Sequence, residues 1–559
     1  MKRILKNGKI FTLNKDNSEV SAVVLDGKKI IYAGSSDGAV AYSDNAEVTD
    51  LDGKTVLPGF IDSHTHPAGC ASTAWHVKLP WTEDKDELLR FVKEYAEAHD
   101  KYEVPFLFFE YYPTSMFGIT GPRKEMLDEI VSDRPCLCQD FGDHMCWVNS
   151  RMLELMGVDK NTPDPSQIEI FERDEDGEPT GWIKERAWIY FEDKLYNAIG
   201  WRPPGLDKKT MENYLDSVKA YGITSLADCL IEKEELLDSI YELDKEGKLE
   251  IFYDVAVRFY HYSELPEGIE RLKAYRKKYG TEHIRFTSMK LFLDGTNELG
   301  NSALLSEHIN DPGNFGEITM DTEELADCFY LCSSEKLDLH IHMVGDRAFR
   351  TGCDAVEKAQ KRIKAEGGQW NCQPIFAHCE LVDPADMKRP AELGITINCS
   401  CHWSGGYFGE EAKNFISEEK WETMYQFNPM LESGAMVTFS SDVVTNYEFH
   451  RSYPLFGMQV AATRVDPEFP VDPVKYPGSV RLPLSAKLSV KDLIKGYTID
   501  GAKQLHIDNL TGSIEAGKLA NLVVLDNNPY TVPAEKLSTI NVHSVYIEGK
   551  ERRIKRRIN

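Results

Sequence analysis

Both ends of the chain alternate short apolar stretches with turn dipeptides. Near the N-terminus, the apolar stretches are separated by Asn7-Gly8, Asp26-Gly27 and Asp52-Gly53. Such dipeptides favour tight hairpin turns, so they predict short β-strands. The last fifty residues, with TGSIEAGKLANLVVLDNNP and INVHSVYIEGKERRI, repeat this pattern. We therefore expect residues 1–55 and 508–559 to form one small, discontinuous, β-sandwich-like domain.

The middle of the chain, residues 56–507, has a different pattern. Apolar strand-like segments are each followed by polar sequence with the periodicity of a helix. In chain order the segments are LPGFIDSHTH, ITSLADC, YDVAVRF, FTSMKLFLDG, LDLHIHMVGD, PIFAHCEL, TINCSCHW and MVTFSSD. Eight such units predict an α/β fold, specifically a (β/α)8 or TIM barrel.

A long insertion, at about 68–207, separates the first strand from the second. It holds strand-like segments of its own, VPFLFFEYY and RPCLCQDF, and a turn-rich hairpin, FERDEDGEPTGWI. Because it leaves the end of the first strand, we expect it to cap the mouth of the barrel. Its aromatic residues either shape a pocket there or form the core of the insertion. They include Tyr111, Tyr112, Phe117, Trp147 and Trp182.

Polar residues with metal-binding side chains occur at the ends of the predicted barrel strands. They are His64 and His66 on the first strand, Lys290 on the fourth, His340 and His342 on the fifth, His378 on the sixth and Asp442 on the eighth. Alternate residues on a strand face the same side, so the two histidines of the first strand can bind one metal ion; taken alone, they could equally be surface histidines. In a barrel these strand ends meet on one face. Histidines and a carboxylate from separate strands indicate a catalytic metal rather than a structural one.

The composition of the chain limits the kinds of partner that it can bind. The chain has 559 residues and a net charge of −27, and this negative field disfavours nucleic acid and anionic membranes as partners. We find no apolar run long enough to span a bilayer and no secretory signal, and expect a cytoplasmic protein. Most of the twelve cysteines lie in apolar stretches, which predicts buried free thiols. The expected partner is a small-molecule substrate, and a homodimer is left open.

Several segments, taken in order, carry a resemblance to a known family. LPGFIDSHTH, MKLFLDGT, HIHMVGDRA, FAHCEL, FSSD and GSIEAGKLANLVVLD resemble the amidohydrolase superfamily. The cap segments DHMCWVNS and GEPTGWIKE are similar to those of its YtcJ-like branch, the amidohydrolase 3 family. The resemblance covers nearly the whole chain.

This resemblance implies a set of metal ligands. His64 and His66 would bind a first metal, His342 and His378 a second, and Lys290 would bridge the two as a carbamate. Asp442 would lie beside the reactive water, as a ligand and as the catalytic acid and base. One or two Zn²⁺ ions are expected, with Mn²⁺ or Fe²⁺ as alternatives. The alternative for Lys290 is an ordinary barrel lysine paired with a carboxylate such as Asp294.

The function predicted from these residues is a metal-dependent hydrolase that cleaves an amide-like C–N bond. Metal-activated hydroxide would attack an N-substituted amide, an N-formyl compound or a cyclic amide. The chain lacks the GxSxG signature of a nucleophilic serine. Alternatives are a deaminase or an esterase on the same metal centre, or a non-catalytic regulator that binds a small molecule.

The chain departs from the family pattern at two places. Asn521 replaces an acidic residue that family members often carry, which we expect to affect only the β-domain. Cys399-Ser400-Cys401-His402 replaces a stretch that often reads Gln-Pro-x-His. His402 is therefore a weaker candidate for contacting the substrate, as are His144 and Trp182 in the cap.

Overall fold

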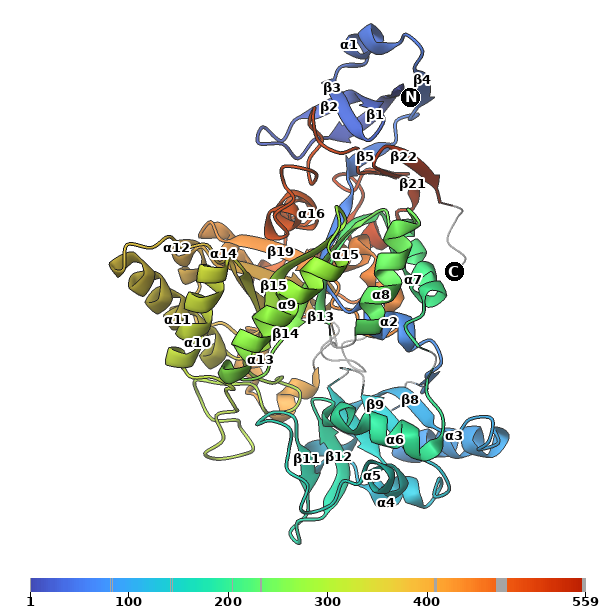
Figure 1. The fold of residues 1–559 in the computed structure, drawn as a ribbon, viewed down its shortest axis with the longest axis vertical. Coiled ribbons are helices and arrows are strands. Elements are labelled where there is room, and N and C mark those ends of the chain that lie inside the picture. The colour runs from blue at the N-terminus through green and yellow to red at the C-terminus, as the bar shows by residue number, and fades with distance from the viewer. Residues whose placement is uncertain are drawn as a thin grey trace.

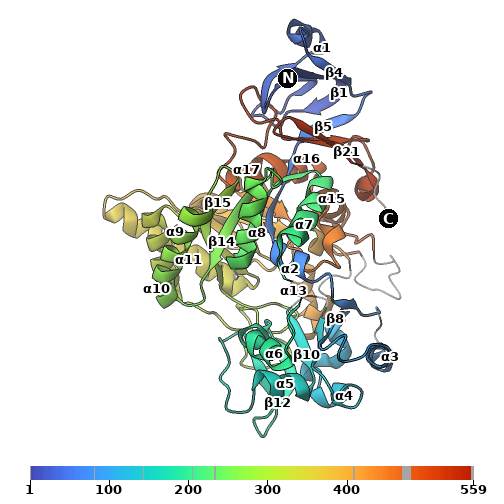
Figure 2. The ribbon, with the colours of Figure 1, turned by 45° about the vertical axis from the view of Figure 1, so that its right-hand side comes forward.

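The computed structural model describes residues 2–80, 82, 84–140, 142, 144–203, 205–231, 234–406, 410–468 and 480–554. Its described strands form three sheets: one from both ends of the chain, one from the insertion, and one from the barrel. Figures 1 and 2 show the sheet of the chain ends at one end of the molecule and the insertion at the other, with the barrel between them.

Eight parallel strands form the barrel sheet. They are β6 (Phe60–Thr65), β13 (Ile223–Ile231), β14 (Phe252–Arg258), β15 (Ile284–Phe292), β16 (Asp338–Met343), β17 (Pro374–His378), β18 (Thr396–Ser400) and β19 (Met436–Ser440), each hydrogen-bonded to the next. The first and last strands meet where Ser63 Oγ donates to the carbonyl of Phe439 at 3.0 Å. The predicted (β/α)8 barrel is confirmed. Its strands are buried nearly throughout because helices cover the outside and side chains fill the inside.

Helices follow the strands and cover the outside of the barrel. They are α7 (Lys208–Ala220), α8 (Glu234–Lys245), α9 (Leu265–Tyr279), α10 (Thr322–Glu335), α11 (Asp346–Ala365), α12 (Arg389–Leu393), α13 (Glu418–Glu422), α14 (Asn428–Glu432), α15 (Pro454–Thr463), α16 (Val490–Lys495) and α17 (Gly501–Gln504). In α11, Ala348, Gly352, Val356, Ala359 and Ile363 recur every three or four residues and are buried. Helix α10 begins with a capping box between Asp321 and Glu324.

The insertion folds as a cap with its own six-stranded sheet. The strands lie in the order β11 (Phe171–Arg173), β12 (Pro179–Lys184), β10 (Met145–Val148), β9 (Cys136–Asp140), β8 (Leu107–Tyr112) and β7 (Val77–Lys78). The predicted hairpin is present as the antiparallel pair β11–β12. The helices that accompany the sheet are α2 (Pro67–Ser72), α3 (Lys85–Ala98), α4 (Lys124–Asp128), α5 (Ser150–Met156) and α6 (Glu192–Ile199).

The cap aromatics named from the sequence belong to the cap itself. Tyr112 and Trp147 are fully buried against Leu88 and Val92 of α3, with Phe117 packed on the same cluster. Tyr111 packs on Tyr447, with ring centroids 4.6 Å apart. Tyr112, Phe117 and Trp147 therefore contribute to a core of the cap that is separate from the barrel core, as one of the two alternatives expects, whereas Tyr111 contacts the loop after β19.

Strands from both chain ends share one sheet. Its order is β22 (Lys550–Arg553), β21 (Val542–Ile547), β20 (Leu522–Leu525), β5 (Thr55–Pro58), β1 (Lys2–Phe11), β2 (Glu19–Asp26) and β3 (Lys29–Gly34), with β4 (Glu47–Asp50) beside β1 and the short helix α1 (Ser36–Ala39) after β3. The antiparallel pair β5–β20 joins the two ends. Asn521 lies here, and its side-chain oxygen accepts a hydrogen bond from the Glu548 N–H at 2.8 Å.

The structure bears on two further expectations. All twelve cysteines are free and buried, as predicted. Within the ranges described above, we find no helix that combines the length and the apolar character needed to cross a membrane.

His283 connects the barrel to the terminal sheet. It lies in the loop between α9 and β15, and its Nδ1 is 2.7 Å from Asp244 Oδ1 on α8. Its Nε2 is 3.3 Å from Glu548 Oε1, next to β21. Lys28, in the turn between β2 and β3, also pairs with Glu548, at 2.8 Å. Hydrogen bonds from Asp244 and then Glu548 raise the pKa of His283 to about 9.

This contact predicts a pH-dependent stability. The folded pKa of His283 lies above its unfolded value near 6.5, so its contribution is fully present below pH ~6.5 and is lost as the pH rises through about 9. We expect His283→Gln to lower the free energy of unfolding by roughly 2 kcal/mol at pH 6 and by much less at pH 10. Urea unfolding at both pH values measures this. An equal loss at pH 6 and pH 10 would contradict the assignment.

Candidate metal centre

The site lies at the C-terminal ends of the barrel strands, beneath the cap. His64 is within β6 and His66 directly follows it, so the two-residue period of the strand directs both to the same side. Their rings are 5.3 Å apart, centroid to centroid. His64 is fully buried, and His66 is partly exposed to the cavity under the cap.

Asp442 joins these two histidines to a third. Its Oδ1 is 2.9 Å from His66 Nε2 and 3.4 Å from His64 Nε2, and its Oδ2 is 3.3 Å from His378 Nδ1. The backbone of Asp442 has φ 51°, and that of His378 has φ 72°. Such left-handed conformations in residues other than glycine are strained, and they concentrate at functional sites.

Lys290 approaches the same group from β15. Its Nζ is 3.4 Å from His64 Nε2, and burial, the largest effect, lowers its pKa to about 8. Asp294, the alternative partner considered from the sequence, instead accepts backbone N–H bonds from Val344, Gly345 and Ala303 at 2.9 Å each. The alternative that paired Lys290 with Asp294 is therefore wrong, since the Asp294 oxygens hold a turn of the backbone.

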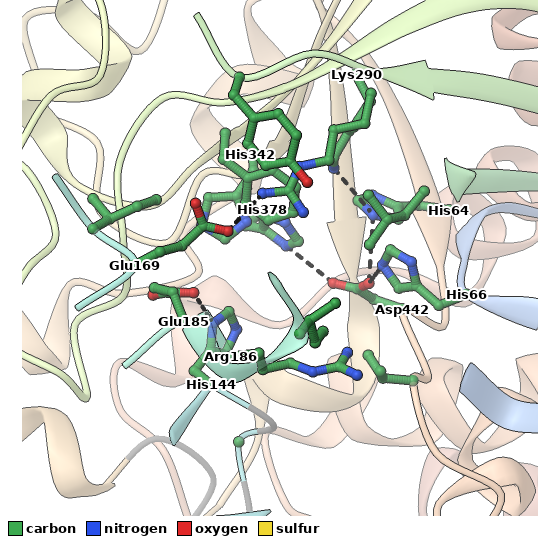
Figure 3. Close-up of a pocket in the computed structure, with 18 of the residues that line it drawn as sticks. His64, His66, His144, Glu169, Glu185, Arg186, Lys290, His342, His378 and Asp442 are labelled. Carbon is green, nitrogen blue, oxygen red and sulfur yellow. Dashed lines mark hydrogen bonds and ion pairs between the residues drawn. The ribbon is translucent and has the colours of Figure 1, made fainter. Parts of the chain in front are cut away.

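His342 and His378 lie beside this group. Their rings are 4.4 Å apart, and His342 Nε2 is 3.3 Å from the carbonyl oxygen of Gly295. His378 stacks on Trp403, with centroids 5.4 Å apart and an interplanar angle of 20°. Figure 3 shows His64, His66, Lys290, His342, His378 and Asp442 facing one another.

The electrostatics of the site suit a cation. Burial lowers the pKa values of His64, His342 and His378 well below 6.5, with neighbouring positive groups acting in the same direction. These imidazoles are therefore neutral and have lone pairs to donate. One ligand atom from each of His64, His66 and Asp442 lies within 4.8 Å of the others. Neutral imidazoles with one carboxylate are ligands that zinc and similar divalent metals prefer, so the residues fit such an ion.

His340, also on β16, lies behind the ligand set. Its Nε2 is 3.2 Å from His64 Nδ1, and Cys229 Sγ is 3.7 Å from its Nδ1. A partner on Nδ1 of a ligating histidine fixes which nitrogen of that ring points at the metal. The sequence grouped His340 with His342, and the structure separates them because the strand register sets His340 beside Lys290 and His342 beside Phe292.

The cap supplies the other wall of a cavity of about 280 Å³. His144, just before β10, faces this cavity, and its Nδ1 is 2.7 Å from Glu185 Oε2. Burial alone would lower the pKa of His144, but the charge and hydrogen bond of Glu185 outweigh it and raise the pKa to about 10. On the opposite wall Arg258 pairs with Glu169 at 3.0 Å.

Two of the weaker candidates for substrate contact, Trp182 and His402, lie outside the lining of this cavity. Trp182 packs with Met145 and Leu299, and its indole N–H lies 3.0 Å from Met145 Sδ. His402 is buried in a 3₁₀ turn at Cys401–Ser404, while its neighbour Trp403 lines the cavity. Neither Trp182 nor His402 is among the lining residues, so direct substrate contact by either does not match the structure. Adjacent residues in a tight turn face different ways, which the sequence pattern does not resolve.

Sequence reasoning did not assign several lining residues. Glu185 lies within the cap segment GEPTGWIKE, which predicts no role for it, and the sequence pattern does not distinguish Glu169, Arg186, Arg258 or Trp403 from other residues. The only local signal is the run Lys184-Glu185-Arg186, in which charged residues follow a buried strand. Their place in the cavity depends on how the cap docks on the barrel.

Comparison with known proteins gives the family. The model of the amidohydrolase family matches residues 47–552. The chain is 28% identical over 447 residues to the exoenzymes regulatory protein AepA of Pectobacterium carotovorum, covering 78% of this chain and 92% of that protein. It is 25% identical to the putative amidohydrolase YtcJ of Bacillus subtilis, covering 98% and 99%. It is also 25% identical to the N-substituted formamide deformylase of Arthrobacter pascens, covering 97% and 96%.

A solved structure shares the fold. An uncharacterised metal-dependent hydrolase from Pyrococcus horikoshii aligns with a TM-score of 0.69 and 23% identity, over 96% of this chain and 99% of that one. The family match spans the barrel sheet, the cap sheet and the part of the terminal sheet that follows residue 47, and it includes every strand-end residue of the site. The chain belongs to the amidohydrolase family, enzymes that hydrolyse C–N bonds.

Proposed function

We propose that this protein is a metal-dependent hydrolase that cleaves the amide-like C–N bond of a small molecule. Candidate substrates are an N-substituted amide, an N-formyl compound or a cyclic amide. The observation that carries the proposal is the convergence of His64, His66 and Asp442 at the covered mouth of the barrel. A relative named for deformylation of N-substituted formamides supports the choice of bond.

Asp442 has the central role in proton transfer. His64, His66 and Asp442 would hold a divalent metal, which would make hydroxide available near neutral pH. Asp442 would accept the proton of the attacking water and pass it to the leaving nitrogen, since its carboxylate faces the cavity from the end of β19. This relay requires the carboxylate to lie within hydrogen-bond distance of both the water and the leaving nitrogen. The Asp442 carboxylate lies at the floor of the cavity, where both would bind.

His144 would stabilise the negative charge that develops on the carbonyl oxygen. Its pairing with Glu185 keeps it protonated at neutral pH and occupies Nδ1, which leaves Nε2 for the substrate. A fixed positive charge in a water-poor cavity stabilises an oxyanion more strongly than it would in water. Its ring is 6.1 Å from that of His342, so it acts from the side opposite the barrel strands.

We extend the proposal to the metals and to Lys290. Zinc is the expected metal, and Lys290 is expected to bridge two ions as a carbamate, with His342 and His378 on the second ion. The lowered pKa of Lys290 supports this, because the neutral amine adds carbon dioxide. The free, buried state of all twelve thiols supports a reducing compartment, in keeping with the cytoplasm.

A regulator without catalysis is the competing function, and the name of the Pectobacterium relative favours it. Metal analysis of the purified protein and a hydrolysis screen with N-substituted amides, including formamides, separate the two. Turnover after loading with zinc or manganese supports the enzyme. A protein that binds metal and hydrolyses no member of the panel favours the regulator.

Asp442 and His66 are expected to behave differently when substituted. We expect Asp442→Asn to retain most of its metal while turnover falls roughly a hundredfold or more, the usual range for a general acid–base residue. His66→Ala is expected to lose both metal and activity. Elemental analysis beside steady-state kinetics measures this, with Asp176→Asn in the exposed turn of the cap hairpin as the control. Full activity in His66→Ala would overturn the ligand assignment.

Lys290→Ala is expected to lose part of the bound metal and most activity. Acetate or propionate should restore part of both, because a small carboxylate can fill the place of the carbamate. Lys219→Met is the matched control, since Lys219 is also buried but bonds to the Lys248 carbonyl outside the barrel, at 2.9 Å. Protein supplied with ¹³C-bicarbonate should show a carbamate carbon resonance that Lys290→Ala lacks. Full metal content and activity in Lys290→Ala would contradict the bridge.

A further inference from the structure

A second cavity adjoins the one over the metal centre, and the two, here called lobes, share six lining residues. The first lobe measures about 280 Å³ and the second about 310 Å³. Residues shared by the two lobes form a junction: His66, Arg186, Ile189, Glu192, Leu230 and Val444. A molecule whose reacting bond lies at His66 can therefore extend through this junction into the second lobe.

The second lobe is aromatic. Trp75, Phe108, Trp188 and Tyr196 line it, with Trp75 and Phe108 ring centroids 5.7 Å apart and Phe108 and Trp188 6.0 Å apart. His76 also lines it, stacked on Phe108 and held by the Glu110 carboxylate. These rings offer a rigid apolar surface, which suits a flat or bulky apolar group of a ligand.

Arg186 brings a positive charge to the junction. Glu185 and Arg186 follow β12 with φ of 52° and 57°, so two consecutive residues are left-handed. This conformation sends Glu185 to His144 and lets Arg186 line both lobes. Figure 3 shows Arg186 on the cap side of the cavity, across from Asp442 and His66.

The charge of Arg186 lacks a partner within the described parts of the chain. None of the carboxylates there forms an ion pair with it, and its Nε is buried without a hydrogen-bond partner. Glu192 also lines the junction, but it interacts with the Tyr196 hydroxyl. By contrast, Arg258 on the far wall is paired with Glu169. A partly buried guanidinium without an anion is costly, and its fork of donors matches a carboxylate.

We propose that Arg186 binds a carboxylate of the substrate and that the second lobe holds an aromatic group of the same molecule. The substrate class is then an N-formyl or N-acyl aromatic amino acid. In such compounds the carboxylate and the ring both branch from the carbon next to the amide nitrogen. We therefore expect the amide to lie at the metal centre, the carboxylate at the junction and the aromatic ring in the second lobe.

This inference rests on the proposed amide hydrolysis. In that reaction the water oxygen bonds to the acyl carbon, the C–N bond breaks, and the nitrogen takes up a proton. The products are formate, or another carboxylic acid, and the free amino acid. Arg186 positions the substrate and takes no part in this proton transfer.

The test compares two compounds that differ only in the carboxylate: N-formylphenylalanine, as both enantiomers, and N-formyl-2-phenylethylamine. With metal-loaded protein we expect kcat/KM for the better enantiomer to exceed that for the neutral amide roughly 10- to 100-fold. Arg186→Gln should reduce this preference at least tenfold, chiefly through KM, and Arg186→Lys should restore only part of it. The matched control is Arg151→Gln, a cap arginine paired with Glu154 on the surface, which should keep the preference.

The outcomes separate this inference from the proposed function. Equal turnover of the two compounds by the wild type, or an unchanged preference in Arg186→Gln, overturns carboxylate recognition and leaves amide hydrolysis standing. If neither compound is hydrolysed, calorimetric binding decides. Binding of N-formylphenylalanine by the wild type and its loss in Arg186→Gln supports carboxylate recognition while hydrolysis fails. Absence of binding to the wild type overturns the inference.

Discussion

Desolvation of the strand-end side chains is the constraint on which the site depends. His64, His342 and His378 are removed from water, and burial makes their protonated forms unfavourable. Among the described residues, His66 Nδ1 and His378 Nδ1 are buried without a hydrogen-bond partner, which is a costly arrangement in the absence of a cation. The left-handed backbone at His378 and Asp442 adds strain. A divalent ion offsets these costs together, because it satisfies the lone pairs and the carboxylate at one point.

The cap completes the wall of the site and also determines where charged side chains lie within it. It builds its own core from Tyr112, Trp147 and the apolar face of α3, so it can cover the barrel mouth without sharing the barrel core. Glu185 and Arg186, which follow β12, then place opposite charges in different parts of the cavity. Glu185 fixes the charge of His144, and Arg186 extends into the junction between the lobes. In the function proposed above, a single strand end would therefore connect stabilisation of the reaction to selection of the substrate.

The terminal sheet supports the strand that carries the first histidines. Strand β5 pairs with β20, and the chain then turns through Gly59 into β6. The Gly59 N–H donates to the Asn521 carbonyl at 2.9 Å, and a side chain at position 59 would collide with Thr224 of the neighbouring strand β13. His283 attaches the sheet to the barrel through Glu548, which Lys28 holds from within the sheet. The position of β6, and with it of His64, is held from both sides.

Local sequence patterns determined much of the secondary structure of this protein and the positions of several site residues. The eight apolar segments, the Asp26-Gly27 hairpin turn and the cap hairpin were predicted, because hydrophobic periodicity and turn residues act over a few neighbours. The hairpin turn expected at Asn7-Gly8 was wrong, because these residues lie within the single strand β1 at a shift of register. The strand-end positions of His64, His66, Lys290, His378 and Asp442 also followed, since a parallel barrel brings these ends to one face. The tertiary structure decided the rest. The register of β15 and β16 placed His340 behind His64, and a tight turn exposed Trp403 to the cavity in place of His402. The docking of the cap, which no local pattern encodes, packed Trp182 against Leu299 of the barrel loop after β15 and put Arg186 at the junction. Sequence spacing determines which residues share a face of one element, whereas the partner of that face depends on packing between elements far apart in the chain.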